Sequence, residues 1–327
     1  MQKSDNLMAG IILVTGAQGF VGQPLSFALT KQGYQVRAAL RGNVQTNDGQ
    51  QTISVGEING DTHWAEALVD VAVVIHLAAR VHVMNETAAD ALSAYRQVNV
   101  EGTLNLARQA VQAGVKRFIF ISSIKVNGES TVLGHPFREE QTPAPLDAYG
   151  ISKYEAELAL QQLAKETGLE LVVIRPVLIY GPGVKANFKA MMRCLDIGLV
   201  LPLGSIQNQR SLLALDNLIN LIQLCITHPA AANQIFLASD GVDMSTPELL
   251  IAMGSALGKP ARLFKLPEPL IMIAAKLLGK HAMAERLCGS LQVDSSKARE
   301  LLGWQPPLSV REALDKVAIA YRNNRSC

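Results

Sequence analysis

Short apolar runs and longer amphipathic stretches alternate along the first half of the chain. Residues 9–15 (AGIILVT) form a continuous apolar run that stops at a glycine, which is typical of a strand buried on both faces. From residue 20 to residue 31 apolar side chains recur at helical spacing, and Gly33 stands where a helix C-cap is expected. The same patterns predict further strands over residues 36–40, 52–55, 71–77, 118–122 and 169–175, and helices over residues 88–113 and 149–166.

These elements predict an α/β fold built on a doubly wound parallel sheet of the Rossmann type, because each right-handed crossover places a helix against the sheet. Beyond residue 180, frequent prolines break the chain into shorter helices and turns. We therefore expect a dinucleotide-binding domain over residues 1–180 and a smaller α/β substrate lobe over residues 181–327, some of whose segments return to the sheet. The polar loop over residues 127–147 is long enough to predict a functional role.

The composition excludes several classes of protein. With 49% hydrophobic and 18% charged residues, the 327-residue chain is neither disordered nor a coiled coil. Its net charge of +2 disfavours generic binding to nucleic acid or to anionic membranes, although a local basic pocket is compatible with it. No apolar run reaches the ~20 residues of a membrane-spanning helix and the first residues do not form a signal peptide, so we expect a cytoplasmic protein without membrane insertion. The four cysteines and six histidines lack the spacings of a disulfide framework or a metal site, and we predict no metal.

A glycine-rich turn follows the first predicted strand. The sequence TGAQGFVG places Gly16, Gly19 and Gly22 between a buried strand and a helix. In such a turn one glycine makes the tight bend, another lets the backbone approach a pyrophosphate, and the third lets the helix pack on the strand. Free N–H groups and the helix dipole then face the negative charge of the ligand. The turn, including Phe20 and Val21, therefore predicts a dinucleotide site.

The end of the second predicted strand bears on which dinucleotide binds. Sites for NAD usually carry an acid here that binds the ribose 2′-hydroxyl, whereas an arginine suits the 2′-phosphate of NADP. Residues 36–41 (VRAALR) contain no acid and end at Arg41, so the pattern favours NADP over NAD. Further positions after the strands are predicted from their place alone to border the cofactor: Glu57, Ile58, Leu77, Ala78, Ala79, Ser122 and Pro176.

Tyr149 and Lys153 are four residues apart in a predicted helix, so they lie on one face of it. A tyrosine with its ordinary pKa of about 10 is a poor base at neutral pH, and a nearby ammonium stabilises the phenolate and lowers that pKa. Ser122 and Ser123 end the preceding strand at the carboxyl edge of the sheet, where such folds bind ligands. A serine hydroxyl at this position can hydrogen-bond a substrate oxygen that interconverts between alcohol and ketone.

Together these motifs resemble the extended short-chain dehydrogenases/reductases, in particular the NAD-dependent epimerase/dehydratase family that acts on nucleotide sugars. The resemblance spans nearly the whole chain. It implies that Ser123, Tyr149 and Lys153 act together in catalysis and that Lys153 also holds the nicotinamide ribose. The motifs that carry it are TGAQGFVG at 15–22, VIHLAA at 74–79, NVEGTLNL at 99–106, FIFISS at 118–123, YGISK at 149–153, RPVLIYGP at 175–182, RSLLALDNL at 210–218 and LGW at 302–304.

For the second lobe, the resemblance implies binding of a UDP-sugar. Arg210 matches the arginine that grips the diphosphate, a task suited to a guanidinium because it can meet phosphate oxygens with two parallel hydrogen bonds. Asn187 and Phe188 stand like the residues that meet the diphosphate. Pro202 and Leu203 resemble the short stretch that lies along the uracil ring.

The segment after the serine pair departs from the usual pattern of the family. The chain reads IKVNG where common members carry a small polar residue followed by Val-Tyr-Gly, so we expect Lys125 and Asn127 to face the sugar and alter which sugar is accepted. The segments SSIKVNGE, GPGVKANF and PLG look most like the branch found in bacterial surface-polysaccharide pathways, which works at C4 of UDP-N-acetylhexosamines.

Two activities of that branch share one half-reaction. A reductase delivers hydride from an exchangeable cofactor to a UDP-4-keto-hexosamine, whereas a 4-epimerase oxidises C4, rotates the keto sugar and returns the hydride to the other face. Arg41 and the missing acid suit exchangeable NADPH and lead us to expect the reductase, with a UDP-glucose or UDP-N-acetylglucosamine 4-epimerase as the alternative. A remote alternative is a non-catalytic NAD(P)-binding scaffold, since fold alone does not give function. The resemblance also implies a homodimer formed through the helices over residues 88–113 and 149–166.

Overall fold

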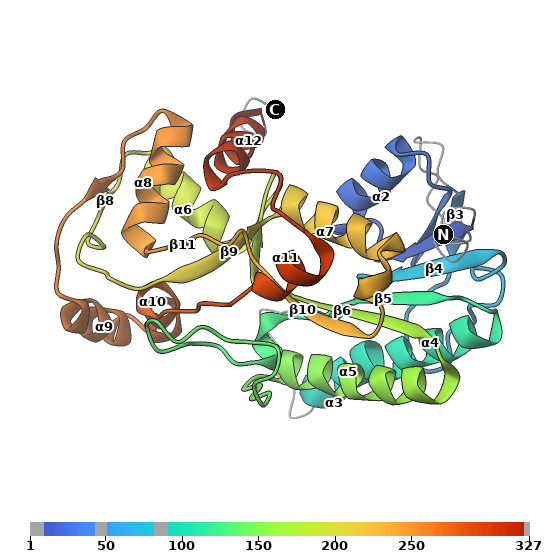
Figure 1. Ribbon diagram of the computed structural model, residues 1–327. Coiled ribbons are helices and arrows are strands. Elements are labelled where there is room, and N and C mark those ends of the chain that lie inside the picture. The colour runs from blue at the N-terminus through green and yellow to red at the C-terminus, as the bar shows by residue number, and fades with distance from the viewer. Residues whose placement is uncertain (1–9, 43–50, 82–90, 324–327) are drawn as a thin grey trace.

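A computed structural model describes residues 10–42, 51–81 and 91–323. Within these residues, seven strands form the main sheet (Figure 1): β1 (Ile11–Thr15), β2 (Val36–Leu40), β3 (Gln51–Ser54), β4 (Val71–His76), β5 (Arg117–Ile121), β6 (Glu170–Pro176) and β10 (Gln234–Ala238). Their order across the sheet is β10, β6, β5, β4, β1, β2, β3, and each neighbouring pair is parallel. The predicted doubly wound parallel sheet is therefore confirmed.

Helices cover both faces of this sheet (Figure 1). The side chains of β1 show how one strand serves two cores, because Ile12 and Val14 pack into one apolar cluster while Ile11 and Leu13 pack into the other. Burial on both faces explains why the strands read as continuous apolar runs. One face carries α2 (Gly22–Lys31), α7 (Leu215–Thr227) and α11 (Ser296–Leu302), and the other carries α3 (Ala91–Arg96), α4 (Thr103–Gln112) and α5 (Ala148–Thr167).

The chain beyond residue 180 forms most of a second lobe at one end of the molecule (Figure 1). Its core includes Tyr180 and Phe188, whose rings stack with centroids 5.5 Å apart. The elements α7, β10 and α11 lie with the main sheet instead, and the division of the chain at residue 180 stays a prediction. The elements of the lobe are β7 (Leu178–Tyr180), α6 (Ala186–Asp196), β8 (Val200–Leu201), β9 (Arg210–Ala214), β11 (Asp243–Met244), α8 (Thr246–Leu257), β12 (Arg262–Leu263), α9 (Glu268–Leu277), α10 (His281–Cys288) and α12 (Val310–Asn323).

The single helix predicted over residues 88–113 is interrupted in the structure. Residues 88–90 lie outside the described residues, as does the first residue of the strand predicted over 9–15. Between α3 and α4 the chain forms a π-helical turn over Gln97–Gly102. The wider turn directs the buried Asn99 amide inward, where it donates to the Ser152 hydroxyl at 2.9 Å and to the Arg80 carbonyl at 3.1 Å. Hydrophobic periodicity cannot detect such a turn, because the apolar positions on either side of it remain helical.

Candidate active site

A large cavity of about 910 Å³ lies where the carboxyl ends of the main-sheet strands meet the second lobe. The loops after β1, β4 and β5 and the start of α5 form one side of its wall, and residues of α6, α8 and α10 form the other. Because β1 lies between β2 and β4, the connection after β1 leads to one side of the sheet and the connection after β4 leads to the other. A crevice opens between them at this edge of the sheet. Open α/β sheets bind their ligands in such a crevice.

The turn between β1 and α2 brings backbone atoms too close together for side chains. Gly16 has a φ of +67°, and a Cβ atom on it would lie 2.8 Å from the amide nitrogen of Ala78. A Cβ atom on Gly22 would lie 2.1 Å from the carbonyl oxygen of Gly16. In the described part of the chain no side chain caps the start of α2. The amides of Gln23 and Leu25 donate to the Gly19 and Val21 carbonyls at 3.1 Å, which leaves the N–H of Gly22 in this first turn for a ligand. The turn therefore fits the pyrophosphate of a dinucleotide.

Gly22→Ala is expected to weaken binding of the dinucleotide about tenfold or more. The added methyl group forces the Gly16 carbonyl out of the turn, and overpacking of this kind costs about 1–3 kcal/mol. The dissociation constant for NAD, measured by calorimetric titration of nucleotide-free protein, tests this expectation. Gly60→Ala is the matched control, because its Cβ atom would lie 3.7 Å from the Cβ atom of Glu101, an ordinary contact. Unchanged affinity in Gly22→Ala would argue against a pyrophosphate at this turn.

Ser123 and Tyr149 meet at the wall of the cavity. Tyr149 lies in the first turn of α5, which begins where the Asp147 carboxylate accepts a hydrogen bond from the Gly150 amide at 2.7 Å. The Ser123 hydroxyl accepts a hydrogen bond from the amide of Lys125 at 3.2 Å, so its own hydrogen is available to donate. A hydrogen bond between the Ser123 side chain and Tyr149 stabilises the phenolate form of the tyrosine. The two groups can therefore act on one substrate oxygen.

The structure differs from the sequence argument in the acidity of Tyr149. We expected Lys153 to lower the pKa of this tyrosine, but burial, reinforced by the charge of Asp147, raises it above its usual value, and the Ser123 hydrogen bond offsets only part of that rise. Lys153 is itself buried, with its ammonium 2.9 Å from the Ile121 carbonyl and 4.5 Å from the centroid of the Phe120 ring. Burial lowers the pKa of Lys153 to about 7. At neutral pH a smaller fraction of this side chain is therefore protonated than of an exposed lysine.

A buried polar network lies behind these residues. The Arg175 guanidinium, 2% exposed, pairs with the fully buried Glu157 carboxylate, and the closest nitrogen and oxygen atoms are 2.6 Å apart. The Ser122 hydroxyl donates to the same carboxylate, and Arg175 also donates to the Asn127 side chain at 2.9 Å. The expectation that Asn127 faces the sugar is therefore wrong, because its side chain is buried in this network. Glu157 lies one helical turn after Lys153 on α5, so the network positions the helix that carries the candidate catalytic pair.

Two arginines meet at the second-lobe side of the cavity. Arg210, at the start of β9, donates through Nη1 to the carbonyls of Arg286 and Gly289 at 3.0 and 2.9 Å. No hydrogen bond from the described part of the chain reaches its Nη2 or Nε atoms, so these can serve a ligand. Burial and the nearby charge of Arg286 lower the pKa of Arg210. Both side chains line the cavity, and this pair of positive charges suits a diphosphate.

The cavity brings together most of the residues singled out from the sequence. Lys125 lines it, and its ammonium forms ion pairs with Asp147 and with Glu129, the second at 3.0 Å. Glu57, Pro202 and Leu203 do not line it, and Leu203 instead packs into the core of the second lobe. The predicted residues found on its wall are Gly16, Gly19, Phe20, Val21, Gly22, Arg41, Ile58, Leu77, Ala78, Ala79, Ser122, Ser123, Lys125, Tyr149, Lys153, Pro176, Asn187, Phe188 and Arg210.

The sequence argument missed several polar residues of the cavity wall. Glu129 follows the serine pair closely, and the functional role expected for the loop over residues 127–147 could have suggested it. Thr246 and Arg286 belong to helices of the second lobe, and their local sequence carries no motif. Lys185 lies just before α6 and close in sequence to the predicted Asn187, and this closeness could have suggested it as a residue of the cavity wall.

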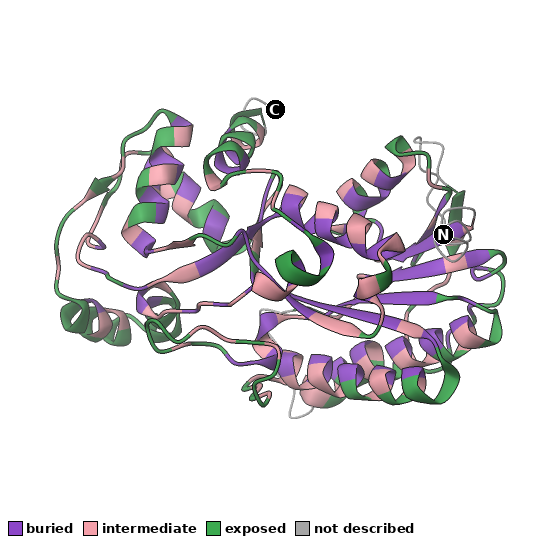
Figure 2. Ribbon diagram, viewed as in Figure 1, coloured by how far each residue is buried: buried purple, intermediate pink, exposed green. Residues whose placement is uncertain are grey.

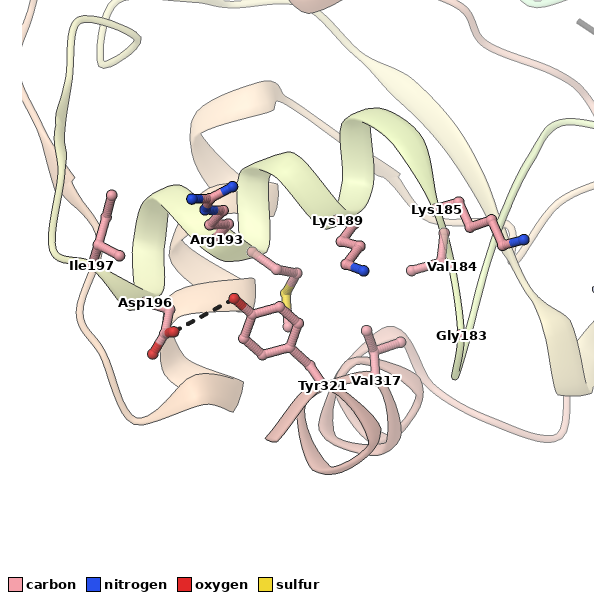
Figure 3. Close-up of a pocket in the computed structure, with 10 residues that line it drawn as sticks. Gly183, Val184, Lys185, Lys189, Arg193, Asp196, Ile197, Val317 and Tyr321 are labelled. Atoms are coloured by element: carbon pink, nitrogen blue, oxygen red, sulfur yellow. Dashed lines mark hydrogen bonds between the residues drawn. The ribbon is translucent and has the colours of Figure 1, made fainter. Parts of the chain in front are cut away.

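A second cavity, of about 590 Å³, lies between α6 and α12 (Figure 3). Lys189 and Arg193 of α6 line it, and the Tyr321 hydroxyl of α12 donates to Asp196 across one end at 3.5 Å. None of the candidate catalytic residues lines this cavity, but Val184 and Lys185 line both cavities, so the second one adjoins the site described above.

Neither a membrane-spanning helix nor a metal site is found among the residues that the structure describes. No helix among them combines the length and apolar character needed to cross a bilayer. Within the same ranges, no three or more histidine, cysteine, aspartate or glutamate side chains form a group able to hold a metal ion.

Comparison with known proteins gives a consistent family assignment. The model of the NAD dependent epimerase/dehydratase family matches residues 12–238. A UDP-glucose 4-epimerase of Vibrio cholerae is 50% identical over 331 residues, which cover 99% of this chain and 100% of the relative.

Solved structures agree in fold over almost the whole length. A UDP-glucose 4-epimerase of Thermotoga maritima, solved with UDP-glucose, superposes with a TM-score of 0.76 at 24% identity and covers 96% of this chain and 99% of its own. A UDP-glucuronic acid 4-epimerase of Bacillus cereus, solved in complex with NAD, superposes with a TM-score of 0.77 at 22% identity and covers 96% of both chains.

Proposed function

The chain belongs to the NAD dependent epimerase/dehydratase family, and on that basis we propose that it is a UDP-hexose 4-epimerase. The observation that carries this proposal is the 50% identity, over the full length of both chains, to a UDP-glucose 4-epimerase. Ser123, Tyr149 and Lys153 at the cavity wall support it, because a scaffold protein would not need a serine, a tyrosine and a lysine around one cavity.

The proposed cofactor is NAD, held by the turn over Gly16–Gly22 and by the strand ends that follow it. Arg41 led us to favour NADP, but the family description names NAD and the Bacillus cereus relative was solved with NAD. When bound, NAD supplies the capacity to accept a hydride from C4 and to return it. The spacing of glycines fits its pyrophosphate, since a Cβ atom at Gly22 would fill the turn.

The residues of this chain supply the proton chemistry at the C4 oxygen. Tyr149 takes the proton of the C4 hydroxyl as C4 is oxidised, and gives it back when the alcohol is restored. Ser123 donates a hydrogen bond to the same oxygen and stabilises the charge that develops on it. Lys153 follows Tyr149 by one helical turn on α5 and lines the same cavity. Its amine is proposed to hold the nicotinamide ribose, because burial, Asp147 and Ser123 are the main influences on the pKa of Tyr149.

The second-lobe wall of the cavity provides the substrate contacts in this proposal. Arg210 and Arg286 bind the diphosphate, because two guanidinium groups there would otherwise repel each other without compensation. Asn187 of α6 lines the same wall and is proposed to meet the diphosphate. Phe188 was expected beside it, but its ring is 2% exposed and stacks on Tyr180 in the core of the lobe. A free Arg210 Nη2 suits a phosphate oxygen, whereas an apolar substrate would leave both charges unpaired.

The proposal replaces the reductase expected from Arg41. A reductase releases its oxidised cofactor after each turnover, whereas an epimerase regenerates the bound cofactor within one catalytic cycle. The comparisons favour the epimerase, since the full-length relative carries that activity in its name. A role in bacterial surface-polysaccharide synthesis remains a prediction from the segments SSIKVNGE and GPGVKANF.

Purified protein is expected to convert UDP-glucose or UDP-N-acetylglucosamine to its 4-epimer without added reductant, and to release NAD when it is denatured. Chromatography of the sugar nucleotides and of the released dinucleotide measures both outcomes in one preparation. Product that forms only from a 4-keto sugar with added NADPH, together with an empty site or NADP on denaturation, would contradict the epimerase proposal.

The proposal also covers the oligomeric state and the location of the protein. The chain is proposed to form a homodimer through α3, α4 and α5, and light scattering that gives a monomeric mass would contradict it. A cytoplasmic location remains a prediction from the sequence.

A further inference from the structure

Lys125 joins the two segments that carry the candidate catalytic hydroxyls. Its backbone amide donates to the Ser123 hydroxyl at 3.2 Å, and its ammonium forms an ion pair with the Asp147 carboxylate. That carboxylate caps the start of α5, where its other oxygen accepts from the Gly150 amide at 2.7 Å. The backbones are also close, since a Cβ atom on Gly150 would lie 2.9 Å from the Lys125 carbonyl oxygen. Lys125 therefore links the end of β5 to the helical turn that holds Tyr149.

The ion pair lies at the boundary between the buried site and water. The residues just after β5 are mostly buried, and the loop is mostly exposed from Glu129 onward (Figure 2). The Lys125 and Asp147 side chains are 22% and 31% exposed. Water screens such a pair only in part, so each of the two charges weakens the field that the other exerts on a third group nearby.

Tyr149 is the third group. The charge of Asp147 is one of the causes that raise the pKa of this tyrosine. Lys125 pairs with Asp147 and with Glu129, so this cluster of three side chains carries one positive and two negative charges, a net charge of about −1. Without Lys125 the net charge would be about −2, and the phenolate would form less readily.

Other ionisable groups also surround the phenol. Lys153 follows it on α5, and the Tyr95 ring of α3 meets the Tyr149 ring edge-on, with centroids 6.2 Å apart. The Arg80 guanidinium lies 5.7 Å from the centroid of the Tyr95 ring. These groups are the same in all variants named below, so they do not account for differences among the variants. Other parts of the cavity wall carry Arg41, Lys185, Arg210 and Arg286.

We propose that Lys125 is a positioning residue for the proton transfer, because its ammonium neutralises Asp147 and thereby lets Tyr149 reach the phenolate form. The inference rests on the proposed function, in which Tyr149 moves the proton of the C4 oxygen. Lys153 has different contacts, since its ammonium meets the Ile121 carbonyl and the Phe120 ring, whereas Lys125 meets the carboxylate that acts on Tyr149. A contact between Lys125 and the sugar remains a separate prediction.

Nitration of Tyr149 by tetranitromethane tests the proposal, because the reagent attacks the phenolate and the rate follows the phenolate fraction. Tyr149 lines the cavity, so the reagent can reach it. Lys125→Met keeps the backbone amide and removes the charge. It is expected to slow nitration about tenfold, which corresponds to a rise of about one unit in the pKa of Tyr149. Mass spectrometry of the peptide that contains Tyr149 measures the rate, and Lys125→Arg should keep the rate of the unchanged protein.

Asp147→Asn tests the same pair from its other side. Asparagine is a good N-cap, so α5 keeps its start, and loss of the negative charge should accelerate nitration of Tyr149. The double variant Lys125→Met with Asp147→Asn restores the net charge of about −1, so its nitration rate should return close to that of the unchanged protein. Lys165→Met is the matched control, because it removes an exposed lysine near the far end of α5, and it should leave the rate unchanged.

The pH dependence of kcat/KM for 4-epimerisation gives the same test in turnover. A base that must be deprotonated makes the rate rise with pH up to its pKa, so the acidic limb should move up by about one unit in Lys125→Met and down in Asp147→Asn. An equal loss of rate at every pH, or a double variant as slow as Lys125→Met in either assay, would overturn the proposal. Nitration does not require turnover. Protein that shows the expected nitration rates but no epimerisation would therefore contradict the proposed function and leave the charge effect of Lys125 established.

Discussion

Tyr149→Phe is expected to lower the rate of 4-epimerisation about a thousandfold while leaving the dinucleotide bound. Loss of a positioned acid and base typically costs about a hundredfold to ten-thousandfold. In the proposed reaction the phenol moves the proton of the C4 oxygen, and Ser123, which hydrogen-bonds the phenol, donates to the same oxygen. The turnover number with UDP-glucose and the amount of NAD released on denaturation measure the two halves of the expectation.

Tyr154→Phe is the matched control for this experiment. Tyr154 lies on the same helix, one residue beyond Lys153, and it does not line the cavity. Its variant should retain the activity of the unchanged protein. An unchanged rate in Tyr149→Phe would show that another group moves the proton.

Glu157→Gln is expected to lower the free energy of unfolding by about 3–5 kcal/mol. Removing one partner of a buried ion pair leaves the other charge buried without compensation, and that loss far exceeds what an exposed pair contributes. The amide that replaces the carboxylate keeps one acceptor oxygen for Arg175 and Ser122, but it carries no charge to balance the buried guanidinium and turns the second acceptor into a donor. Denaturant unfolding followed by circular dichroism measures the change.

Glu155→Gln provides the control on the same helix. Glu155 pairs with Arg96 at the surface, where the two side chains are 30% and 46% exposed, and such exposed pairs contribute about 0.2–1 kcal/mol. Combining Glu157→Gln with Arg175→Gln should restore part of the lost stability, because no buried charge then remains unpaired. Similar losses in Glu157→Gln and Glu155→Gln would mean that the buried pair does not hold α5 in place.

Local motifs carried most of what could be predicted. The glycine turn, the serine pair and the Tyr149 and Lys153 spacing are each contained within a few consecutive residues, and their residues lie together on one cavity. Positional guesses far from such motifs were less reliable. Leu203 was predicted to lie along a base, yet it packs into a core that includes Leu249 and Leu314, both more than forty residues away in sequence.

The sequence by itself determined the parallel sheet, the dinucleotide turn and the residues able to carry the chemistry, because hydrophobic period and glycine geometry act over short stretches of chain. Only the tertiary structure decided what surrounds them. It joined Arg210 to Arg286, buried Asn127 with Arg175, and paired Lys125 with Asp147. These outcomes depend on contacts between segments far apart in sequence, and the same contacts set the burial that raises the pKa of Tyr149 and lowers that of Lys153. The spacing of four residues places Tyr149 and Lys153 on one face of a helix, but it does not determine how far the fold buries them from water.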